Sequence, residues 1–324
     1  MADSVLITGG AGFIGSHLAE ALLDRGTTVY IVDNLSTGSL ENLAEVKDQP
    51  KLHVTVDTVM NWPLMVELVQ EVDQVIHLAA AVGVRKILEE PVETITTNVR
   101  GTEIVLDCCN RAGKKLFVAS TSEIYGKAGD KLHEDTDRIL GSTMHRRWSY
   151  ACTKTLDEFL ALAYNYDKGL PVIIGRFFNT VGPRQTGQWG MVLPTFVGQA
   201  LRGEPITVYG TGDQSRCFCH VQDSIRAVQG VMDDEGAVGE VFNIGHEEEI
   251  TIRGLAERVK ERTASDSPIQ VIPYDEAYES GFEDMLRRQP DTSKIRTLLD
   301  WAPTHDINGI IDSVIEHFRE DRGL

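Results

Sequence analysis

Long apolar runs are missing from this 324-residue chain. A helix that spans a bilayer needs about 20 consecutive apolar residues, and no such stretch occurs. The first residues, Met1 to Ser4, also lack the positively charged start and the cleavage site of a secretory signal. These absences favour a cytoplasmic protein without a membrane partner.

Cysteine is scarce and carries no motif. The five cysteines are an odd number and contain no CxxC pair, so neither a disulfide framework nor a zinc site is supported. A reducing compartment is the simple interpretation. His246 and Glu247 begin an HExxH pattern, but Ile250 occupies the position of its second histidine. We therefore expect no metal.

Positive charge is in deficit, with 31 Lys and Arg residues against 49 Asp and Glu residues and a formal net charge of −18. Nucleic acids and anionic membranes bind basic surfaces, so neither is expected as a partner. A ligand that carries phosphate remains compatible if local groups hold it. The length suffices for one large domain or for a large and a small one.

What the chain does contain is a regular alternation of strand and helix patterns. Val5-Leu6-Ile7 is followed by glycines, an amphipathic stretch from Ile14 to Arg25 and a second strand over 29–32. Further strands are expected at 54–56, 75–78, 116–119 and 172–174, and helices at 96–111 and 150–166. This alternation predicts an α/β fold, a Rossmann-type doubly wound parallel sheet.

The regular alternation of strand and helix patterns ends after Asn179. Glycine and proline are frequent between Gly182 and Gly212, and the units become less regular. A helix is expected at 223–232, a strand at 241–244, and amphipathic helices at 251–262 and 306–319. We predict a dinucleotide-binding domain formed by residues 1–179 and 217–245, and a smaller C-terminal substrate-binding domain formed by 180–216 and 246–324.

The first strand-to-helix turn predicts a cofactor site. It contains Gly9, Gly12, Phe13, Ile14 and Gly15. Glycines permit a tight turn and a close approach of the backbone to a pyrophosphate. The helix that follows offers free N–H groups and a partial positive charge. We therefore expect this turn to hold the pyrophosphate of NAD(P).

Asp33 indicates which dinucleotide binds. It ends the second strand, 18 residues beyond Gly15, where a carboxylate accepts hydrogen bonds from the adenosine ribose and repels a 2′-phosphate. We predict NAD, with Asn34 also at the cofactor. A turn-forming role for Asp33 is the alternative.

Two strand ends nearby carry further candidates. Asp57 follows the third strand and is suited to meet the adenine amino group or to cap a turn. Ala79 and Ala80 follow the fourth strand and leave room for the cofactor. His77 is better interpreted as a strand-end histidine whose hydrogen bonds are satisfied.

Tyr150 and Lys154 form the candidate catalytic pair. They stand four residues apart on a predicted helix and share a face. Tyrosine, with a reference pKa of about 10, is a poor base, but a nearby ammonium favours its phenolate. The segment from Ser120 to Gly126 follows the fifth strand, at the sheet edge where ligands of open α/β sheets bind.

Together these motifs resemble the extended short-chain dehydrogenase/reductases that modify nucleotide sugars. The resemblance extends over essentially the whole chain. It rests on the Gly9 to Gly15 loop, His77 to Ala80, Asn98, Thr121, Tyr150, Lys154, the Arg176-Phe177-Phe178-Asn179 run with Gly182-Pro183-Arg184, and Arg216-Cys217-Phe218 with Val221 and Asp223.

The resemblance implies roles for these residues. Tyr150 is the general base, Lys154 tunes it and binds the nicotinamide ribose, and Thr121 bonds the sugar hydroxyl. Asn98 belongs to the cofactor site, and the substrate-binding residues are Asn179, Arg184 and Arg216. An Asx-turn for Asn179 and a solvated surface position for Arg216 are the alternatives. The resemblance also implies a UDP-sugar substrate and a homodimer through the helices at 96–111 and 150–166.

The residues after Thr121 separate members of the family. Ser122-Glu123 stands where 4,6-dehydratases carry Asp-Glu and where many 4-epimerases have small or neutral residues. Thr-Ser-Glu before Ile-Tyr-Gly looks like the UDP-glucuronate decarboxylases, including UDP-xylose synthases. Glu123 then handles the proton at sugar C5, or else it caps the loop.

Two arginine segments extend this likeness. The run from Arg147 to Cys152 resembles UDP-apiose/UDP-xylose synthases, and the run from Arg287 to Asp291 resembles the Arg-Lys-Pro segment of decarboxylases, with Gln289 in place of the lysine. The resemblance implies that Arg147 or Arg288 stabilises negative charge and that Arg288 meets the glucuronate carboxylate. Surface positions are the alternative for both.

The predicted reaction is decarboxylation of UDP-glucuronate. Oxidation at C4 gives a β-keto acid, which loses CO2 before C4 is reduced again. A UDP-sugar 4-epimerase is the alternative, and a non-catalytic NAD-binding regulatory protein is a third hypothesis. The intact Thr121, Tyr150 and Lys154 argue against the third.

Overall fold

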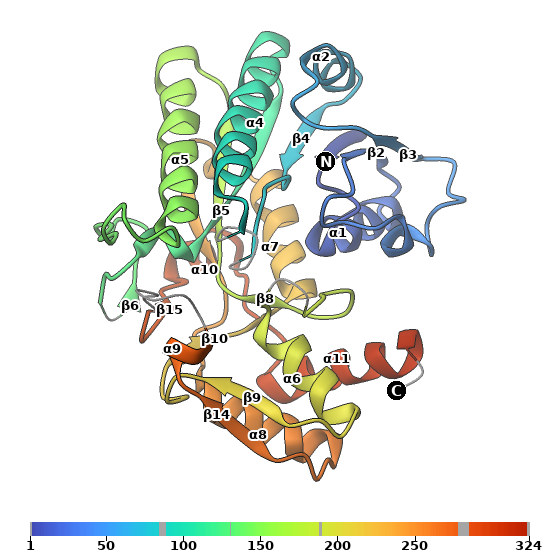
Figure 1. The fold of residues 1–324 in the computed structure, drawn as a ribbon. Helices are drawn as coiled ribbons and strands as arrows, with labels where there is room; N and C mark the ends of the chain where they lie inside the picture. Colours follow the sequence, from blue (N-terminus) through green and yellow to red (C-terminus); the bar gives the residue numbers. More distant parts are fainter. Residues whose placement is uncertain (1, 84–88, 130, 188–189, 278–284, 323–324) are drawn as a thin grey trace.

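A computed structural model describes residues 2–83, 89–129, 131–187, 190–277 and 285–322. Its centre is a parallel sheet of seven strands (Figure 1). In spatial order these are β3 (Leu52–Val56), β2 (Thr28–Asp33), β1 (Ser4–Thr8), β4 (Gln74–His77), β5 (Lys115–Thr121), β7 (Val172–Phe177) and β12 (Val241–Ile244). The order reverses beside β1, and this confirms the predicted Rossmann-type fold class.

Helices cover both faces of the sheet. On one face lie α1 (Phe13–Asp24) and α7 (Val221–Asp233), and on the other lie α2 (Trp62–Gln70), α4 (Pro91–Ala112) and α5 (Trp148–Lys168). The side chains of β1 alternate accordingly. Val5 and Ile7 pack in the α1/α7 core, whereas Leu6 packs in the opposite one. Strands buried on both faces are therefore apolar throughout, as the sequence pattern predicts.

The structure extends the two long helices predicted at 96–111 and 150–166. Pro91 begins α4, a position where its missing N–H costs no hydrogen bond. Both helices end at a glycine in the left-handed conformation, Gly113 (φ 64°) and Gly169 (φ 71°), which L side chains adopt at a cost.

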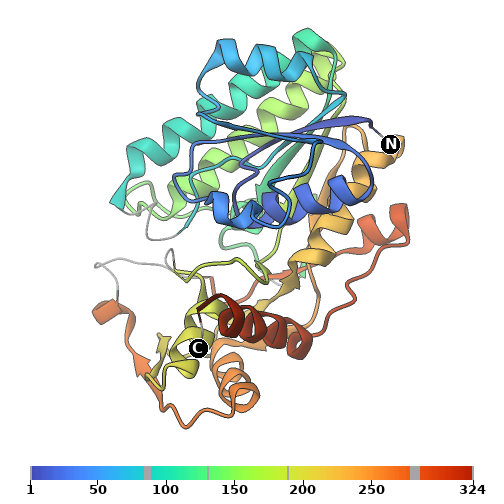
Figure 2. The same cartoon turned by 90° about the vertical axis from the view of Figure 1, so that its right-hand side faces the viewer.

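A second packing unit lies below the carboxyl ends of the strands (Figures 1 and 2). It consists of α6 (Val192–Leu201), α8 (Ile252–Thr263) and α11 (Ile307–Arg322), with the parallel strand pair β9 (Ile206–Tyr209) and β14 (Ile269–Ile272). The sequence reading left α6 in an irregular stretch. Pro194 stands in its first turn, where proline is tolerated.

The remaining elements are short. They are η1 (Leu40–Leu43), η2 (Ser122–Tyr125), β6 (Lys131–Leu132), β8 (Thr180–Val181), β10 (Ser215–Cys217), β11 (Cys219–His220), η3 (Glu235–Ala237), β13 (Glu249–Thr251), α9 (Tyr274–Ala277), β15 (Gln289–Pro290) and α10 (Ser293–Leu299). Ile295 of α10 and Trp301 pack in the α1/α7 core, so the chain returns to the sheet late in the sequence. The predicted domain boundaries stay a prediction. Within the described ranges, no helix has the length and apolarity to cross a bilayer.

Candidate active site

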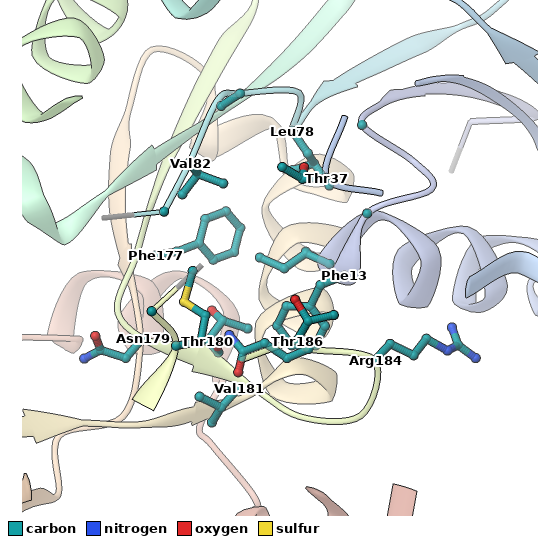
Figure 3. A pocket seen from close by; sticks show the side chains of 18 of the residues that line it. Phe13, Thr37, Leu78, Val82, Phe177, Asn179, Thr180, Val181, Arg184 and Thr186 are labelled. Carbon is teal, nitrogen blue, oxygen red and sulfur yellow. Dashed lines mark hydrogen bonds between the residues drawn. The ribbon is translucent and has the colours of Figure 1, made fainter. Parts of the chain in front are cut away.

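A cleft of about 1760 Å³ lies between the sheet and the second unit, at the carboxyl ends of the strands. Pockets for one small molecule measure roughly 300–1,000 Å³, so this cleft has room for a second ligand. Figure 3 shows Phe13, Val82 and Phe177 pointing into the same part of it, while Arg184 extends away from them.

The glycine turn forms one end of the cleft. Gly9 has φ +73°, and a Cβ on Gly15 would lie 2.3 Å from the Gly9 carbonyl oxygen, so larger residues would break the turn. The N-cap of α1 is Gly12, which has no side chain to accept a hydrogen bond from the N–H groups of the first turn. The first N–H groups of a helix have no intrahelical acceptor, and Phe13 and Ile14 line the cleft there. This end therefore fits a pyrophosphate.

Asp33 lines the cleft and also supports the turn. Its Oδ2 accepts a hydrogen bond from the Ala11 N–H at 2.9 Å, and its Oδ1 accepts one from the Leu35 N–H at 2.8 Å. An ionised carboxylate has about four acceptor positions, so two remain for a ribose. The turn-forming role is thus observed, and it is compatible with the predicted ribose contact. Asn34 also lines the cleft.

Asp57 serves first as a cap. It accepts from the Thr58 N–H at 2.7 Å and from the Asn61 side chain at 2.8 Å, and it lines the cleft as well. Ala79 and Ala80 line the cleft after β4, as predicted.

His77 and Asn98 lie behind the cleft wall. His77 is buried between the hydroxyls of Thr8 (2.7 Å) and Thr102 (3.2 Å). Burial, with a smaller effect of Lys154, lowers its pKa to about 3, so the ring is neutral. Asn98 accepts from the Ala81 N–H at 2.7 Å. Asn98 therefore supports the segment that follows β4 and does not itself line the cleft.

Tyr150 lines the cleft from the first turn of α5. Burial raises the pKa of its hydroxyl, and the nearby Glu123 charge raises it further, while a hydrogen bond with Thr121 acts in the opposite direction. The phenol is therefore protonated in the free protein at neutral pH. Thr121 and Tyr150 are brought together as the sequence predicts.

Lys154 forms an ion pair with Asp157, a residue that the sequence motifs did not indicate. Its Nζ donates to Asp157 Oδ2 at 2.9 Å, and both side chains are buried. The spacing of three residues on one helix is the signal that could have revealed this pair.

Two arginines from distant segments form ion pairs with Glu123. Arg147 Nη2 donates to its Oε2 at 3.2 Å, and Arg288 Nη1 donates to its Oε1. Arg147 is 8% and Arg288 7% exposed, so neither is a solvated surface arginine. Arg288 Nη2 also donates to Asn179 at 2.6 Å. Its buried Nε has no hydrogen-bond acceptor among the described residues. Ser122, between Thr121 and Glu123, lines the cleft too.

Three further predicted substrate residues line the cleft. Asn179 has φ +32° and donates to the Cys217 carbonyl at 2.8 Å, so it anchors β10. Arg184 pairs with Glu20 at 2.6 Å, and Arg216, only 8% exposed, donates to the Ser215 carbonyl at 2.8 Å. Arg184 thus faces α1, which carries Glu20, whereas Arg216 lies on β10, which pairs with β13.

Other lining residues received no role from the sequence. Phe177 ends β7, and Thr180 and Gln185 follow it, so their place at a strand end is the signal that could have found them. Tyr209 ends β9, Gln214 precedes β10 and Tyr274 begins α9, and no motif marks these three. Within the described residues, no group of His, Cys, Asp and Glu is arranged to hold a metal ion.

The chain matches a known protein family over most of its length. Residues 6–314 match the model of the family described as GDP-mannose 4,6 dehydratase. The chain belongs to this family. The extended short-chain dehydrogenase/reductase likeness that the motifs predicted is thereby confirmed.

Relatives of this GDP-mannose 4,6 dehydratase family member include two decarboxylases. The chain is 41% identical over 321 residues to the UDP-N-acetyl-alpha-D-glucosaminuronate decarboxylase of Bacillus cytotoxicus, covering 99% of each. It is 35% identical to UDP-glucuronic acid decarboxylase 1 of Arabidopsis thaliana, covering 98% of this chain and 72% of that protein.

Solved structures show the same architecture. A UDP-glucuronic acid 4-epimerase from Bacillus cereus, in complex with UDP-glucuronic acid and NAD, matches with a TM-score of 0.89 at 27% identity, covering 98% of this chain and 99% of that one. The dTDP-glucose 4,6-dehydratase DesIV from Streptomyces venezuelae, with NAD bound, matches with a TM-score of 0.89 at 30% identity, covering 99% and 98%.

Proposed function

We propose that this protein is an NAD-dependent decarboxylase of a UDP-linked uronic acid, with UDP-glucuronate the favoured substrate. The observation that carries the proposal is the Glu123 carboxylate, held by Arg147 and Arg288 beside Tyr150. An acid is needed there to move a proton at C5, and cations are needed to stabilise negative charge as CO2 leaves. The relatives at 41% and 35% identity are both decarboxylases of UDP-uronates by name.

NAD fits the residues present. When bound, it supplies a reversible hydride acceptor for sugar C4. The uncapped start of α1 binds the pyrophosphate, and Asp33 accepts from the adenosine ribose. The named structural neighbours that contain NAD support this assignment.

The residues around the sugar divide the chemistry among them. The Tyr150 oxygen takes the proton from the C4 hydroxyl, and Thr121 orients that hydroxyl through its own. A 4-keto uronate is a β-keto acid, and its loss of CO2 places negative charge on the enolate. Arg147 and Arg288 stabilise this charge, and Glu123 handles the proton at C5, directly or through water.

Arg288, which lines the cleft, is the residue that we propose meets the uronate carboxylate. Its Nη atoms bind Glu123 and Asn179, and its Nε is buried without an acceptor among the described residues. A buried donor of this kind gains a strong hydrogen bond when an anionic ligand arrives.

A second candidate substrate carries an acetamido group at C2. The 41% identical relative is named for UDP-N-acetylglucosaminuronate, and this favours testing both sugars. The experiment is incubation of the protein and catalytic NAD with each UDP-sugar, followed by mass spectrometry. Loss of the mass of CO2 supports decarboxylation, whereas an isomer of unchanged mass would replace the proposal with 4-epimerisation.

Assembly and location complete the proposal. Ile95 of α4 and Leu156 and Phe159 of α5 are exposed at 42%, 49% and 62%, and a second copy of the chain is the partner we propose for these paired helices. Residues 180–216 and 246–324 form the nucleotide-sugar-binding domain. The free thiols of all five cysteines support a reducing compartment, the cytoplasm.

A further inference from the structure

An ion pair lies buried one turn behind the base. Lys154 and Asp157 are 3% and 0% exposed at their side chains, and their charged atoms are 2.9 Å apart. Asp157 Oδ1 is buried and has no hydrogen-bond partner in the described part of the chain. Burying a carboxylate with one oxygen unsatisfied is costly, because the group has left water without full replacement of its hydrogen bonds.

That cost has a consequence for the reaction proposed above. A lysine ammonium near Tyr150 favours the phenolate. A carboxylate bonded to the same ammonium offsets that effect and fixes where the ammonium lies. We propose that Asp157 is a positioning residue that holds Lys154 in place and restrains ionisation of Tyr150, and so sets the pH at which the base becomes active. The inference rests on the proposed role of Tyr150 as the base.

The electrostatic surroundings of Tyr150 allow this effect to be isolated. The charged groups that act most on Tyr150 are Glu123 on η2, Asp157 on α5 and Arg288 before β15. Arg147, Lys154 and Glu158 also lie at the start of α5 or on it, and Glu158 pairs with Arg176 of β7. Among the other elements that contact α5, β5 carries Lys115, and α4 carries Glu93, Arg100, Glu103, Asp107 and Arg111. His77 of β4 is neutral. Glu123 and Asp157 raise the pKa of Tyr150, and Arg288 lowers it. Removing the Asp157 charge therefore lowers the pKa.

The first test uses Asp157→Asn in the NAD-bound protein without sugar. Tyrosinate is followed by near-ultraviolet absorbance against pH, and the same titration of a Tyr150→Phe version is subtracted. We expect the pKa of Tyr150 to fall by about one unit, the order of magnitude of the effect of a nearby charge on a pKa. Asp167→Asn, an exposed acid farther along α5, is the matched control and should leave the value unchanged. An unchanged value in Asp157→Asn would overturn the proposal.

The second test covers the case in which Asp157→Asn does not fold, because it leaves Lys154 buried and unpaired. The double variant Lys154→Gln with Asp157→Asn removes both charges. If the two charges offset each other, the double variant titrates close to the unmodified protein, whereas Lys154→Gln alone titrates higher. Equal values for the double and the single variant would show that Asp157 has no effect on Tyr150 and would overturn the proposal.

These readouts need no turnover, so they separate the inference from the proposed function. If Asp157→Asn lowers the pKa while no UDP-uronate loses CO2, the proposed function fails and the role of Asp157 stands. If the protein decarboxylates, the rate below the pKa should rise up to about tenfold in Asp157→Asn, since one unit of pKa is a tenfold change in the fraction of base. A rate profile that stays in place despite full activity would contradict the role of Asp157.

Discussion

The carboxylate of Glu123 shows how strongly neighbours define one residue. It is only partly exposed, and Arg147 and Arg288 occupy both of its oxygens. Such a group is fixed in direction and remains an acceptor rather than a flexible surface acid. This geometry is compatible with the proposed role at C5 and also with the alternative, in which the two ion pairs order the loop.

Glu123→Gln is the residue-scale test of that role. The amide keeps the shape of the side chain but cannot take a proton. Formation of the decarboxylated UDP-sugar should therefore slow by at least about 10²-fold, the lower end of the range for general acid–base catalysis. Hydride transfer precedes that proton step, so NADH or a 4-keto intermediate should accumulate, as measured by the absorbance of reduced nicotinamide and by mass spectrometry. Thermal unfolding controls for the loss of two buried ion pairs. In a simple 4-epimerase the substitution would be nearly silent, and full activity would therefore contradict the decarboxylase assignment.

Arg288→Ala tests recognition of the substrate carboxylate. A charge-assisted buried contact is worth roughly 1.5–3 kcal/mol, so the affinity for UDP-glucuronate should fall about 10- to 150-fold, while UDP-glucose binding changes far less. Calorimetric titration of both sugars measures this. Arg287→Ala is the matched control, because Arg287 is exposed and pairs with Glu249 at 2.6 Å. Equal losses for the two sugars would remove Arg288 from carboxylate recognition.

Asp33→Ser tests the choice of cofactor. Loss of the negative charge at the end of β2 should narrow the difference in affinity between NAD and NADP, chiefly by improving NADP. Fluorescence titration with both dinucleotides gives the ratio. Asp57→Asn is the comparison, since Asp57 also lines the cleft but follows β3. A protein that already binds NADP as tightly as NAD would show that Asp33 does not discriminate.

At the scale of elements, a buried network holds the end of β5 in place. Glu158 of α5 accepts from Ser120 at 2.6 Å and pairs with Arg176 of β7 at 2.8 Å, and the two charged residues are nearly inaccessible. Arg176 also donates to the Tyr125 hydroxyl at 2.7 Å. The network joins α5, β5, β7 and η2, so it sets the position of Thr121 and Glu123 relative to Tyr150.

Breaking this network should destabilise the fold. Glu158→Gln leaves Arg176 buried without its ion partner, and this typically costs about 3–5 kcal/mol, measurable by urea unfolding. Glu204→Gln, which breaks the exposed Arg202 pair, should cost less than about 1 kcal/mol.

The same pair makes a pH prediction. Burial alone would raise the pKa of Glu158, but the hydrogen bonds and charge of Arg176 outweigh it, and the net pKa is lowered. A carboxyl group whose pKa is lower in the folded than in the unfolded chain stabilises the folded state at pH values above its unfolded-state pKa. The contribution is therefore present at neutral pH and is lost as the pH falls below the ordinary carboxyl range. Equal acid sensitivity of the unmodified protein and Glu158→Gln would contradict this.

At the scale of the whole molecule, the proposed dimer places α4 and α5 against their copies. Phe159→Glu puts a charge among the exposed apolar side chains of Ile95, Leu156 and Phe159. It should convert the protein to a monomer, as measured by light scattering at micromolar concentration. Val271→Glu, at an exposed position on β14 of the second unit, is the control and should leave the mass unchanged. A monomeric mass for the unmodified protein would remove the interface.

The cleft is also a property of the whole molecule. Tyr150 and the glycine turn belong to the sheet unit, while Phe196 of α6 and Tyr209 of β9 come from the second unit. Neither unit alone encloses the site. Substrate recognition and cofactor binding therefore depend on segments that alternate along the chain.

The sequence by itself determined what is local. The glycine turn, the strand and helix patterns, and the four-residue spacing of Tyr150 and Lys154 each depend on a few consecutive residues, so their structure follows from backbone geometry and periodicity. The family and its fold were predictable from these signals. The weakly patterned α6 was missed because its neighbours, rather than its own sequence, stabilise it as a helix.

Only the tertiary structure decided the electrostatics. Glu123 meets Arg288 across 165 residues, and Asn98 supports Ala81 from behind the cleft wall instead of lining it. Asp157 could be seen three residues from Lys154, but its burial, which makes its charge matter to Tyr150, could not. The strength of a charge depends on what replaces the water around it, and that is set by the packing of distant segments.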